Sequence, residues 1–355
     1  MANSKIDIRN ISFDALSEWV LESGFPKFRA KQIFEWLWKK SVTSYGHMTN
    51  VPLAMRDKLK EDFQFSTLSL ADEQFSTDGT IKAAFNTPVN QTVEGVLIPT
   101  SKRMTACISS QAGCSLACKF CATGRLKLLR NLLPGEIYDQ VVYLKNQASD
   151  KHGINLSNIV YMGMGEPLLN YKNVLKSIEH ITSSEGLGIS PKRITVSTAG
   201  IAKMITKLGD DEVKFNLALS LHAANDDKRS QIMEINDSNN LAALKEALEY
   251  FYEKTGTRVT FEYIIFKDFN DSLHDARELA EFAKCVPCKI NIIEYNPIDD
   301  GEFEQADAEK VDAFAEFLEE RCNLIVNVRR SRGKDIDAAC GQLANKNKAG
   351  NVVFK

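Results

Sequence analysis

The stretch Cys114-Ser-Leu-Ala-Cys118-Lys-Phe-Cys121 places three thiols within eight residues. Thiolates are the ligands of iron–sulfur clusters, and a four-iron, four-sulfur (4Fe-4S) cluster held by three of them keeps one iron open to a small molecule. Structural zinc instead requires four ligands, usually from two CxxC half-sites. No second pair of cysteines lies nearby in the sequence. The spacing therefore favours a 4Fe-4S cluster over a zinc knuckle or a chance group of thiols.

Strand-like and helix-like patterns alternate around this cysteine motif. The predicted strands comprise residues 104–109, 158–162, 192–197, 215–221, 258–266 and 289–295. Amphipathic helical patterns separate most of them. Repeated strand–helix units predict a parallel sheet covered by helices, and six units fit a partial, open barrel, because the common closed barrel has eight. The predicted fold class is α/β, a partial (β/α)6 barrel.

A different pattern precedes the barrel. Residues 1 to about 75 predict short helices, one of which has an apolar stripe with helical spacing at Ala30, Ile33, Phe34, Leu37 and Trp38. We expect a small helical accessory domain at 1–78 and a linking β-hairpin at 79–100. The barrel, with a cysteine-bearing loop near its end, is expected at 101–345, and a tail at 346–355.

The composition is that of an ordinary soluble protein. Of 355 residues, 44% are hydrophobic and 26% are charged. The first residues, MANSKIDIRN, lack the apolar run of a signal peptide, and no stretch is long enough to span a membrane. We expect a monomer in the cytoplasm, where eight cysteines favour metal or redox use over a disulfide framework.

Basic residues form three clusters although the net charge is only −3. The clusters are Lys27, Arg29, Lys31, Lys39 and Lys40 around Trp36 and Trp38; Lys119, Arg125, Lys127 and Arg130; and Arg329, Arg330, Arg332 and Lys334. Each cluster alone is consistent with a solvated surface. Together, and with two of them beside candidate catalytic cysteines, they favour RNA as the partner.

Polar side chains and glycines follow successive predicted strands. They are found in Gly163-Met164-Gly165-Glu166-Pro167, Ser197-Thr198-Ala199-Gly200, Ser220-Leu221-His222 and Asn296-Pro297. Each segment alone is typical of a turn or cap at a strand end. Because ligands of parallel α/β folds bind at the carboxyl ends of the strands, their recurrence predicts one polar pocket.

Five cysteines lie outside the motif. Cys107 falls in the first predicted barrel strand, and Cys340 lies in a loop of small residues just after the third basic cluster. Cys322 fits a buried apolar position. Cys285-Val-Pro-Cys288 could form half of a metal or redox site, but it has no matching second half.

Six motifs carry a resemblance to a known family: CSLACKFCATG, YMGMGEPLLN, ITVSTAG, LALSLH, EYNP and RGKDIDAACGQL. With the basic helical N-terminus, they resemble the dual-specificity ribosomal and transfer RNA adenine-C(2) methyltransferases of the radical S-adenosylmethionine (SAM) superfamily, over nearly the whole chain. The resemblance implies a 4Fe-4S cluster on Cys114, Cys118 and Cys121. It implies SAM contacts at Gly165, Glu166, Ser197, Ser220, Leu221, His222 and Asn296.

The resemblance also assigns catalytic roles. Cys340 would become S-methylated, Cys107 would later close a disulfide with it, and Glu94 would act as the base. The substrates would be 23S rRNA and tRNA, and an electron donor such as flavodoxin would reduce the cluster.

The chemistry of adenine explains why a thiol should intervene. Carbon 2 lies between two ring nitrogens and is electron-poor, so it cannot attack the methyl group of SAM directly, whereas a thiolate can. A second SAM would then activate the S-methyl group, so each turnover would consume two SAM. Methylation of carbon 8 of adenosine, an antibiotic-resistance activity, uses the same cysteine logic, and no residue argument separates the two carbons. A non-methylating iron–sulfur module that binds RNA or transfers electrons is the other alternative.

Overall fold

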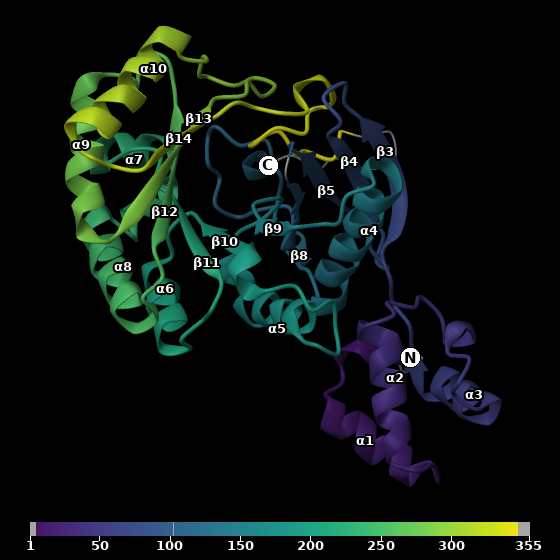
Figure 1. Cartoon of the computed structure of the whole chain (residues 1–355). Coiled ribbons are helices and arrows are strands. Elements are labelled where there is room, and N and C mark those ends of the chain that lie inside the picture. The colour runs from purple at the N-terminus through teal and green to yellow at the C-terminus, as the bar shows by residue number, and fades with distance from the viewer. Residues whose placement is uncertain (1–4, 102, 347–355) are drawn as a thin grey trace.

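The computed structural model describes residues 5–101 and 103–346 (Figure 1). Its centre is a ten-stranded sheet. In spatial order the strands are β14 (Val326–Arg329), β13 (Cys288–Glu294), β12 (Val259–Ile265), β11 (Asn216–Ser220), β10 (Ile194–Thr198), β9 (Asn158–Tyr161), β6 (Met104–Cys107), β5 (Thr92–Pro99), β4 (Ile81–Asn86) and β3 (Ser69–Phe75). Strand β6 and all strands from β9 to β14 pair in parallel, whereas β3 to β6 pair antiparallel.

Helices connect the parallel strands and cover the outer side of the curved sheet (Figure 1). They are α4 (Pro134–His152), α5 (Tyr171–Thr182), α6 (Ala202–Asp210), α7 (Asp226–Ile232), α8 (Leu241–Thr255), α9 (Leu273–Phe282) and α10 (Ala308–Glu316). Strand β12 is buried along its whole length, as expected for a mainly apolar strand in a sheet that is covered on both faces. The predicted partial (β/α)6 barrel is confirmed, and β14 adds a further parallel strand that the sequence did not predict.

Short elements complete the fold. A two-stranded antiparallel sheet joins β7 (Gln111–Ala112) to β8 (Arg130–Asn131). Turns of 3-10 helix lie at Ile8–Asn10, Tyr45–His47, Thr123–Arg125, Pro167–Asn170, Pro191–Arg193, Glu234–Asp237, Ala283–Cys285 and Lys334–Ile336, and a π-helical turn at Phe317–Arg321.

The N-terminal region folds into three helices that project from one side of the barrel (Figure 1). They are α1 (Phe13–Glu22), α2 (Phe28–Trp38) and α3 (Leu53–Asp62), and the short strands β1 (Ile6–Asp7) and β2 (Phe63–Gln64) pair in parallel beside them. Four positions of the predicted stripe, Ala30, Ile33, Leu37 and Trp38, are buried, which confirms the helical face. The prediction of helices up to about residue 75 is wrong for Ser69–Phe75, because this segment pairs with β4.

The helical region is fixed to the barrel through α4 and α5. The Trp38 ring stacks on the His180 ring with centroids 3.6 Å apart and an angle of 5° between the planes. The Arg9 guanidinium lies 2.6 Å from the Asp139 carboxylate, and the Tyr138 hydroxyl donates to the Trp38 carbonyl. These buried contacts give the helices a defined orientation relative to the barrel.

The described part of the chain contains no helix long and apolar enough to cross a membrane. Residues 347–355 of the predicted tail lie outside the described residues.

We predict that Trp38→Ala lowers the free energy of unfolding by about 3–5 kcal/mol, because it removes a buried indole from a packed interface. Chemical denaturation followed by far-UV circular dichroism measures this loss. Trp36→Ala is the matched control: Trp36 is only partly buried and lies under the Lys40 ammonium group, so the loss should be clearly smaller. Equal losses in the two variants would contradict the role of Trp38.

Candidate active site

The cysteine motif forms a loop above the carboxyl ends of the parallel strands, between β7 and the 3-10 turn at Thr123–Arg125. Two glycines allow its tight path. A Cβ atom on Gly113, where φ is +80°, would lie 1.9 Å from the Lys127 carbonyl oxygen, and one on Gly124 would lie 2.8 Å from the Cys118 carbonyl oxygen. All three cysteines line one cavity of about 160 Å³. The expected thiol cluster is therefore formed by local backbone geometry.

The electrostatics of these thiols suit a cationic cluster. Burial raises the pKa of the Cys118 thiol well above its usual range, Cys121 and Cys114 raise it further, and Arg229 lowers it. Since metal ligands must be thiolates, an adjacent cation is needed to keep Cys118 ionised. In the described residues, no three His, Cys, Asp or Glu side chains converge on a single metal ion. An iron–sulfur cluster binds its thiolates on separate irons, so the three thiols need not converge on one point to hold it.

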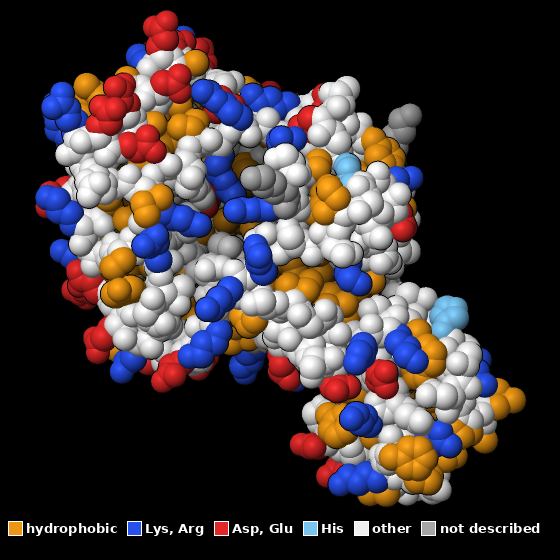
Figure 2. Space-filling model, viewed as in Figure 1, with side chains coloured by type: hydrophobic (Ala, Val, Ile, Leu, Met, Phe, Trp, Pro, Cys, Tyr) orange, Lys and Arg blue, Asp and Glu red, His pale blue; other side chains and the backbone are white. Residues whose placement is uncertain are grey.

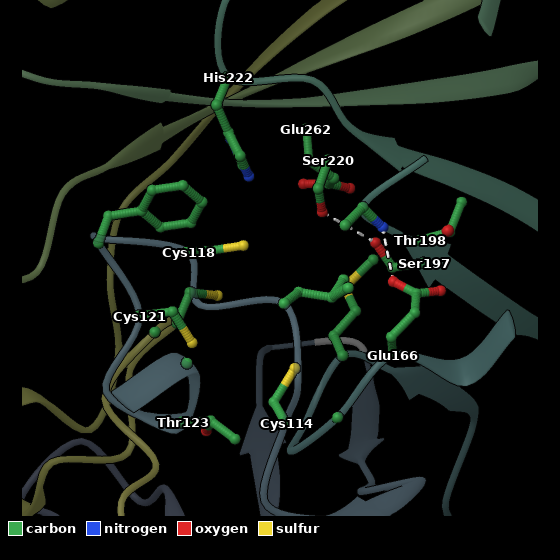
Figure 3. A pocket seen from close by; sticks show the side chains of 18 of the residues that line it. Cys114, Cys118, Cys121, Thr123, Glu166, Ser197, Thr198, Ser220, His222 and Glu262 are labelled. Carbon is green, nitrogen blue, oxygen red and sulfur yellow. Dashed lines mark hydrogen bonds between the residues drawn. The ribbon is translucent and has the colours of Figure 1, made fainter. Parts of the chain in front are cut away.

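Residues from the predicted strand ends form the opposite wall of this cavity (Figure 3). Gly165, Glu166, Ser197, Ser220 and His222 all line it. A Cβ atom on Gly165, where φ is +93°, would lie 2.4 Å from Gln111 Cβ, so glycine is needed for this segment to pack against β7. This cradle presents hydroxyls and a carboxylate opposite the thiols, which fits the amino and carboxylate groups of SAM.

Glu166 is held firmly in this wall. Its carboxylate is buried and accepts hydrogen bonds from the backbone N–H groups of Leu168 (3.0 Å) and Ala199 (2.7 Å). Burial raises its pKa, and these two donors lower it. Each oxygen keeps a further lone pair, so Glu166 can still accept from a ligand ammonium group.

Two of the expected SAM contacts, Leu221 and Asn296, do not line the first cavity. The buried Leu221 uses its carbonyl to accept from Arg229 Nε at 3.1 Å. Asn296 Nδ2 donates to the Cys340 carbonyl at 3.3 Å, and its buried Oδ1 has no hydrogen-bond partner. In this structure Asn296 contacts the loop of Cys340.

A second cavity of about 340 Å³ adjoins the first. Cys121, Arg329, Cys340 and Gly341 line both cavities, while Cys107 lines only the second. Cys107 and Cys340 are both free thiols, and burial raises the pKa of Cys107 to about 12. Cys340 thus faces the cysteine motif on one side and Cys107 on the other.

Glu94 lies outside the lining of both cavities. It is fully buried on β5, and its Oε2 accepts hydrogen bonds from the backbone N–H groups of Ala344 (3.0 Å) and Asn345 (3.1 Å). The Lys82 ammonium lies 3.8 Å from its Oε1. The expected base therefore holds the segment that follows Cys340.

Two residues of the site were not predicted from the sequence. Arg229 is fully buried on α7 and donates to the carbonyls of Ala199 (2.6 Å) and Leu221, tying two strand ends together. Glu262 lies on β12, lines the first cavity and accepts from Asn291 Nδ2 at 2.7 Å. Arg229 follows LALSLH in a run of charged residues, and Glu262 is the single charged residue of an apolar strand. A lone charged residue in an apolar strand indicates a functional position, so Glu262 could have been predicted from the sequence.

The basic clusters are distributed unequally. Basic side chains surround the hollow on the face shown in Figure 2. Arg329, Arg330 and Arg332 of the third cluster line the second cavity. In the other two clusters, Lys40 lies over the Trp36 ring and Arg130 is paired with Glu136. Two members of the third cluster are also paired, Arg329 with Glu262 and Arg330 with Glu294, so its distinction is that it lines the cavity that contains Cys107 and Cys340.

Cys285 and Cys288 are remote from this site. Cys285 lines a separate open depression of about 440 Å³ with residues of α8 and α9, and Cys288 lies 3.5 Å from the Ala283 carbonyl. No described residue links them to the two cavities.

Family models and known proteins match nearly the whole chain. Residues 108–283 match the model of the radical SAM superfamily, and residues 6–64 match that of the ribosomal RNA large subunit methyltransferase N-terminal domain. A protein of Cytophaga hutchinsonii named "Probable dual-specificity RNA methyltransferase RlmN" is 58% identical over 96% of this chain and 93% of its own length. One of the same name from Bacillus pumilus is 41% identical over 96% of this chain and 94% of its own. The crystal structure of a radical SAM methyltransferase from Sphaerobacter thermophilus is 37% identical and superimposes with a TM-score of 0.89, over 95% of this chain and 99% of that one.

His222 supports a prediction about pH. Its Nδ1 accepts from the Ile264 N–H at 3.1 Å, and burial, reinforced by Arg229, lowers its pKa to about 3. The unfolded chain, with a His pKa near 6.5, takes up a proton first as the pH falls. Stability should therefore fall by about 1.4 kcal/mol per pH unit between about 6.5 and 3.

His222→Leu and wild type are both measured by urea denaturation without the cluster. When the pH is lowered from 7.5 to 5.5, we expect the unfolding free energy of His222→Leu to fall less than that of wild type. His274→Leu, which changes an exposed histidine, should behave as wild type. An equal decrease in unfolding free energy at low pH in His222→Leu and wild type would contradict this account.

Proposed function

This chain belongs to the RlmN family of RNA methyltransferases within the radical SAM superfamily, and from that premise we propose that it methylates carbon 2 of adenosine in 23S rRNA and in tRNA. It is a SAM-dependent methyltransferase whose cofactors are a 4Fe-4S cluster and SAM. We propose that the methyl group passes through Cys340 and that each turnover uses two SAM molecules.

The observation that carries this proposal is the position of Cys340. Cys340 lines both cavities. The cysteine motif and Glu166 line the first cavity with it, and Cys107 lines the second. A thiol at this junction can take a methyl group on the first side and deliver it on the second. A direct transfer to carbon 2 would need no such thiol.

The second cavity suits a nucleobase. Val96, Ile98, Val160 and Met162 give it an apolar wall, and Thr100, Arg103 and Thr105 supply polar groups. Enzymes that modify a base inside a structured nucleic acid turn that base out of the stack and into such a pocket. Arg329, Arg330 and Arg332 line the same cavity, where they can neutralise phosphates.

In the proposed reaction, residues of this chain make and break the bonds to sulfur. The Cys340 thiolate attacks the methyl group of SAM, and a new carbon–sulfur bond forms as the sulfonium–methyl bond breaks and S-adenosylhomocysteine leaves. When bound, the cluster with a second SAM supplies the radical chemistry that removes a hydrogen atom from an unactivated methyl group. Carbon 2 then becomes joined to Cys340 through a methylene bridge.

Release of the product requires a base and a second thiol. Glu94 accepts the proton of carbon 2, and one electron leaves the adduct for a one-electron acceptor, a role that the oxidised cluster would fill. The Cys107 thiolate then attacks the sulfur of Cys340. A sulfur–sulfur bond forms as the sulfur–methylene bond breaks, and the methylene carbon takes up a proton to become the methyl group. A reductant must then supply two electrons and two protons to return the disulfide to two thiols, and a donor such as flavodoxin would reduce the cluster. We propose that the enzyme acts as a monomer in the cytoplasm.

The test of this function uses anaerobically reconstituted protein with methyl-deuterated SAM and either 23S rRNA fragments or tRNA. Mass spectrometry of the nucleosides should identify 2-methyladenosine carrying two deuterium atoms in its methyl group, because one is removed before transfer. Product at carbon 8 would assign the antibiotic-resistance activity. Release of deoxyadenosine without methylated RNA would reject methylation.

We predict that Cys107→Ala accumulates a covalent protein–RNA adduct, because the thioether of Cys340 then has no attacking thiol. Denaturing gel electrophoresis of the anaerobic reaction measures the adduct, which should rise at least about tenfold over wild type. Cys340→Ala should form none. Cys322→Ala is the matched control and should behave as wild type. An adduct in Cys340→Ala, or none in Cys107→Ala, would reverse or reject the assigned order of the thiols.

A further inference from the structure

Lys82 is a buried cation next to the proposed base. Its side chain on β4 is only 3% exposed and that of Glu94 is 1% exposed. Lys82 Nζ lies 3.8 Å from Glu94 Oε1 and 3.5 Å from the carbonyl oxygen of Asp337. Burying an ammonium group is costly unless it is paired, so this position is unusual for a lysine.

The register of the sheet places this pair on the face of the second cavity. Lys82 is opposite Val96, and Ala84 is opposite Glu94, so Lys82, Glu94 and Val96 project from the same face. Val96 and Ile98 line the second cavity from that face. Glu94 thus points to the side where the nucleobase is proposed to bind, one step beyond the edge of the cavity.

The segment after Cys340 separates Glu94 from the cavity. Leu343 lines the second cavity, while the next two residues, Ala344 and Asn345, donate their N–H groups to Glu94 Oε2. The other oxygen, Oε1, is buried without a hydrogen-bond partner. A shift of this segment would uncover the carboxylate, and Lys82 on the neighbouring strand would remain beside it.

We propose that Lys82 is a positioning residue for the reaction: its ammonium group joins the Glu94 carboxylate to the backbone of the loop that carries Cys340. The role in catalysis rests on the proposed function, in which Glu94 removes the proton of carbon 2. Asp337 precedes Cys340 by three residues. The contact with the Asp337 carbonyl therefore links Lys82 to the loop that carries the Cys340 thiol. The contact with Glu94 keeps a cation at the base after Ala344 and Asn345 withdraw.

Charge explains why a lysine is needed. Burial raises the pKa of Glu94, while Lys82 and the two backbone donors lower it and the Asp337 carboxylate raises it. A protonated Glu94 cannot accept the proton of carbon 2. When the backbone donors leave, Lys82 is the remaining group among these that favours the carboxylate.

The test compares full-length, cluster-reconstituted Lys82→Met with wild type. Methylation of Cys340, measured by peptide mass, should stay within about twofold of wild type. The protein–RNA adduct should decay at least about tenfold more slowly, and the pH at which its decay is half-maximal should rise by about one unit or more. Lys82→Arg should recover most of the decay rate. Lys176→Met removes the same charge from an exposed ion pair with Glu179. In this control the methylation of Cys340 and the decay of the adduct should be as in wild type.

A second measurement does not depend on activity. Hydrogen exchange in the substrate-free protein should be faster at Ala344 and Asn345 in Lys82→Met than in wild type or Lys176→Met, by about tenfold. The proposal would be overturned if Lys82→Met showed the same rate of adduct decay and the same hydrogen-exchange rates at Ala344 and Asn345 as wild type. If wild type itself forms no methylated Cys340, the proposed function fails, and the exchange rates alone then decide whether Lys82 holds the loop. If Lys82→Met does not fold, Lys82→Gln takes its place in both measurements.

Discussion

The contact between the cysteine loop and the Cys340 loop is the constraint on which the site depends. The Ala122 N–H donates to the Gly341 carbonyl at 2.7 Å, and the Thr123 hydroxyl donates to the Leu343 carbonyl at 2.6 Å across 220 residues of sequence. Asn296 adds a bond to the Cys340 carbonyl itself. Without these bonds, nothing would keep Cys340 beside the three thiols and the strand-end residues that line the first cavity. With them, the exposed Cys340 is fixed at the junction of two cavities.

The fold satisfies this constraint with its two kinds of strand pairing. The parallel strands bring their carboxyl ends to one edge, which supplies the wall of Gly165, Glu166, Ser197 and Ser220. The antiparallel extension contributes Val96 and Ile98 of β5 to the second cavity, and Lys82 of β4 and Glu94 of β5 anchor the end of the chain. In Figure 1 the C-terminal segment crosses from the side of β14 to the side of β4 and β5. The loop that carries Cys340 therefore spans both halves of the sheet.

Local patterns in the sequence were sufficient for part of this arrangement. The spacing of Cys114, Cys118 and Cys121 and the alternation of strands and helices predicted the barrel and the thiol cluster, because both arise within short stretches of chain. Strand β3 has no apolar alternation that distinguishes it, since its face is only partly covered, and its pairing with β4 decides its structure. The contacts of Arg229, and those of Glu94 with Ala344 and Asn345, join distant segments. No spacing rule within one segment can predict such contacts.

Glu94 illustrates what such long-range contacts add to a mechanism. A carboxylate that was always open to the cavity would need no shift before it accepted a proton, and its timing would be independent of Cys340. Here the residues that cover Glu94 and the Cys340 thiol belong to one loop, which also contacts Lys82 through Asp337. A displacement of the Cys340 loop would therefore act on the hydrogen bonds that cover the carboxylate. The same displacement that brings the thiol to its substrate would expose the base, so the order of the steps would follow from the chain's own connectivity.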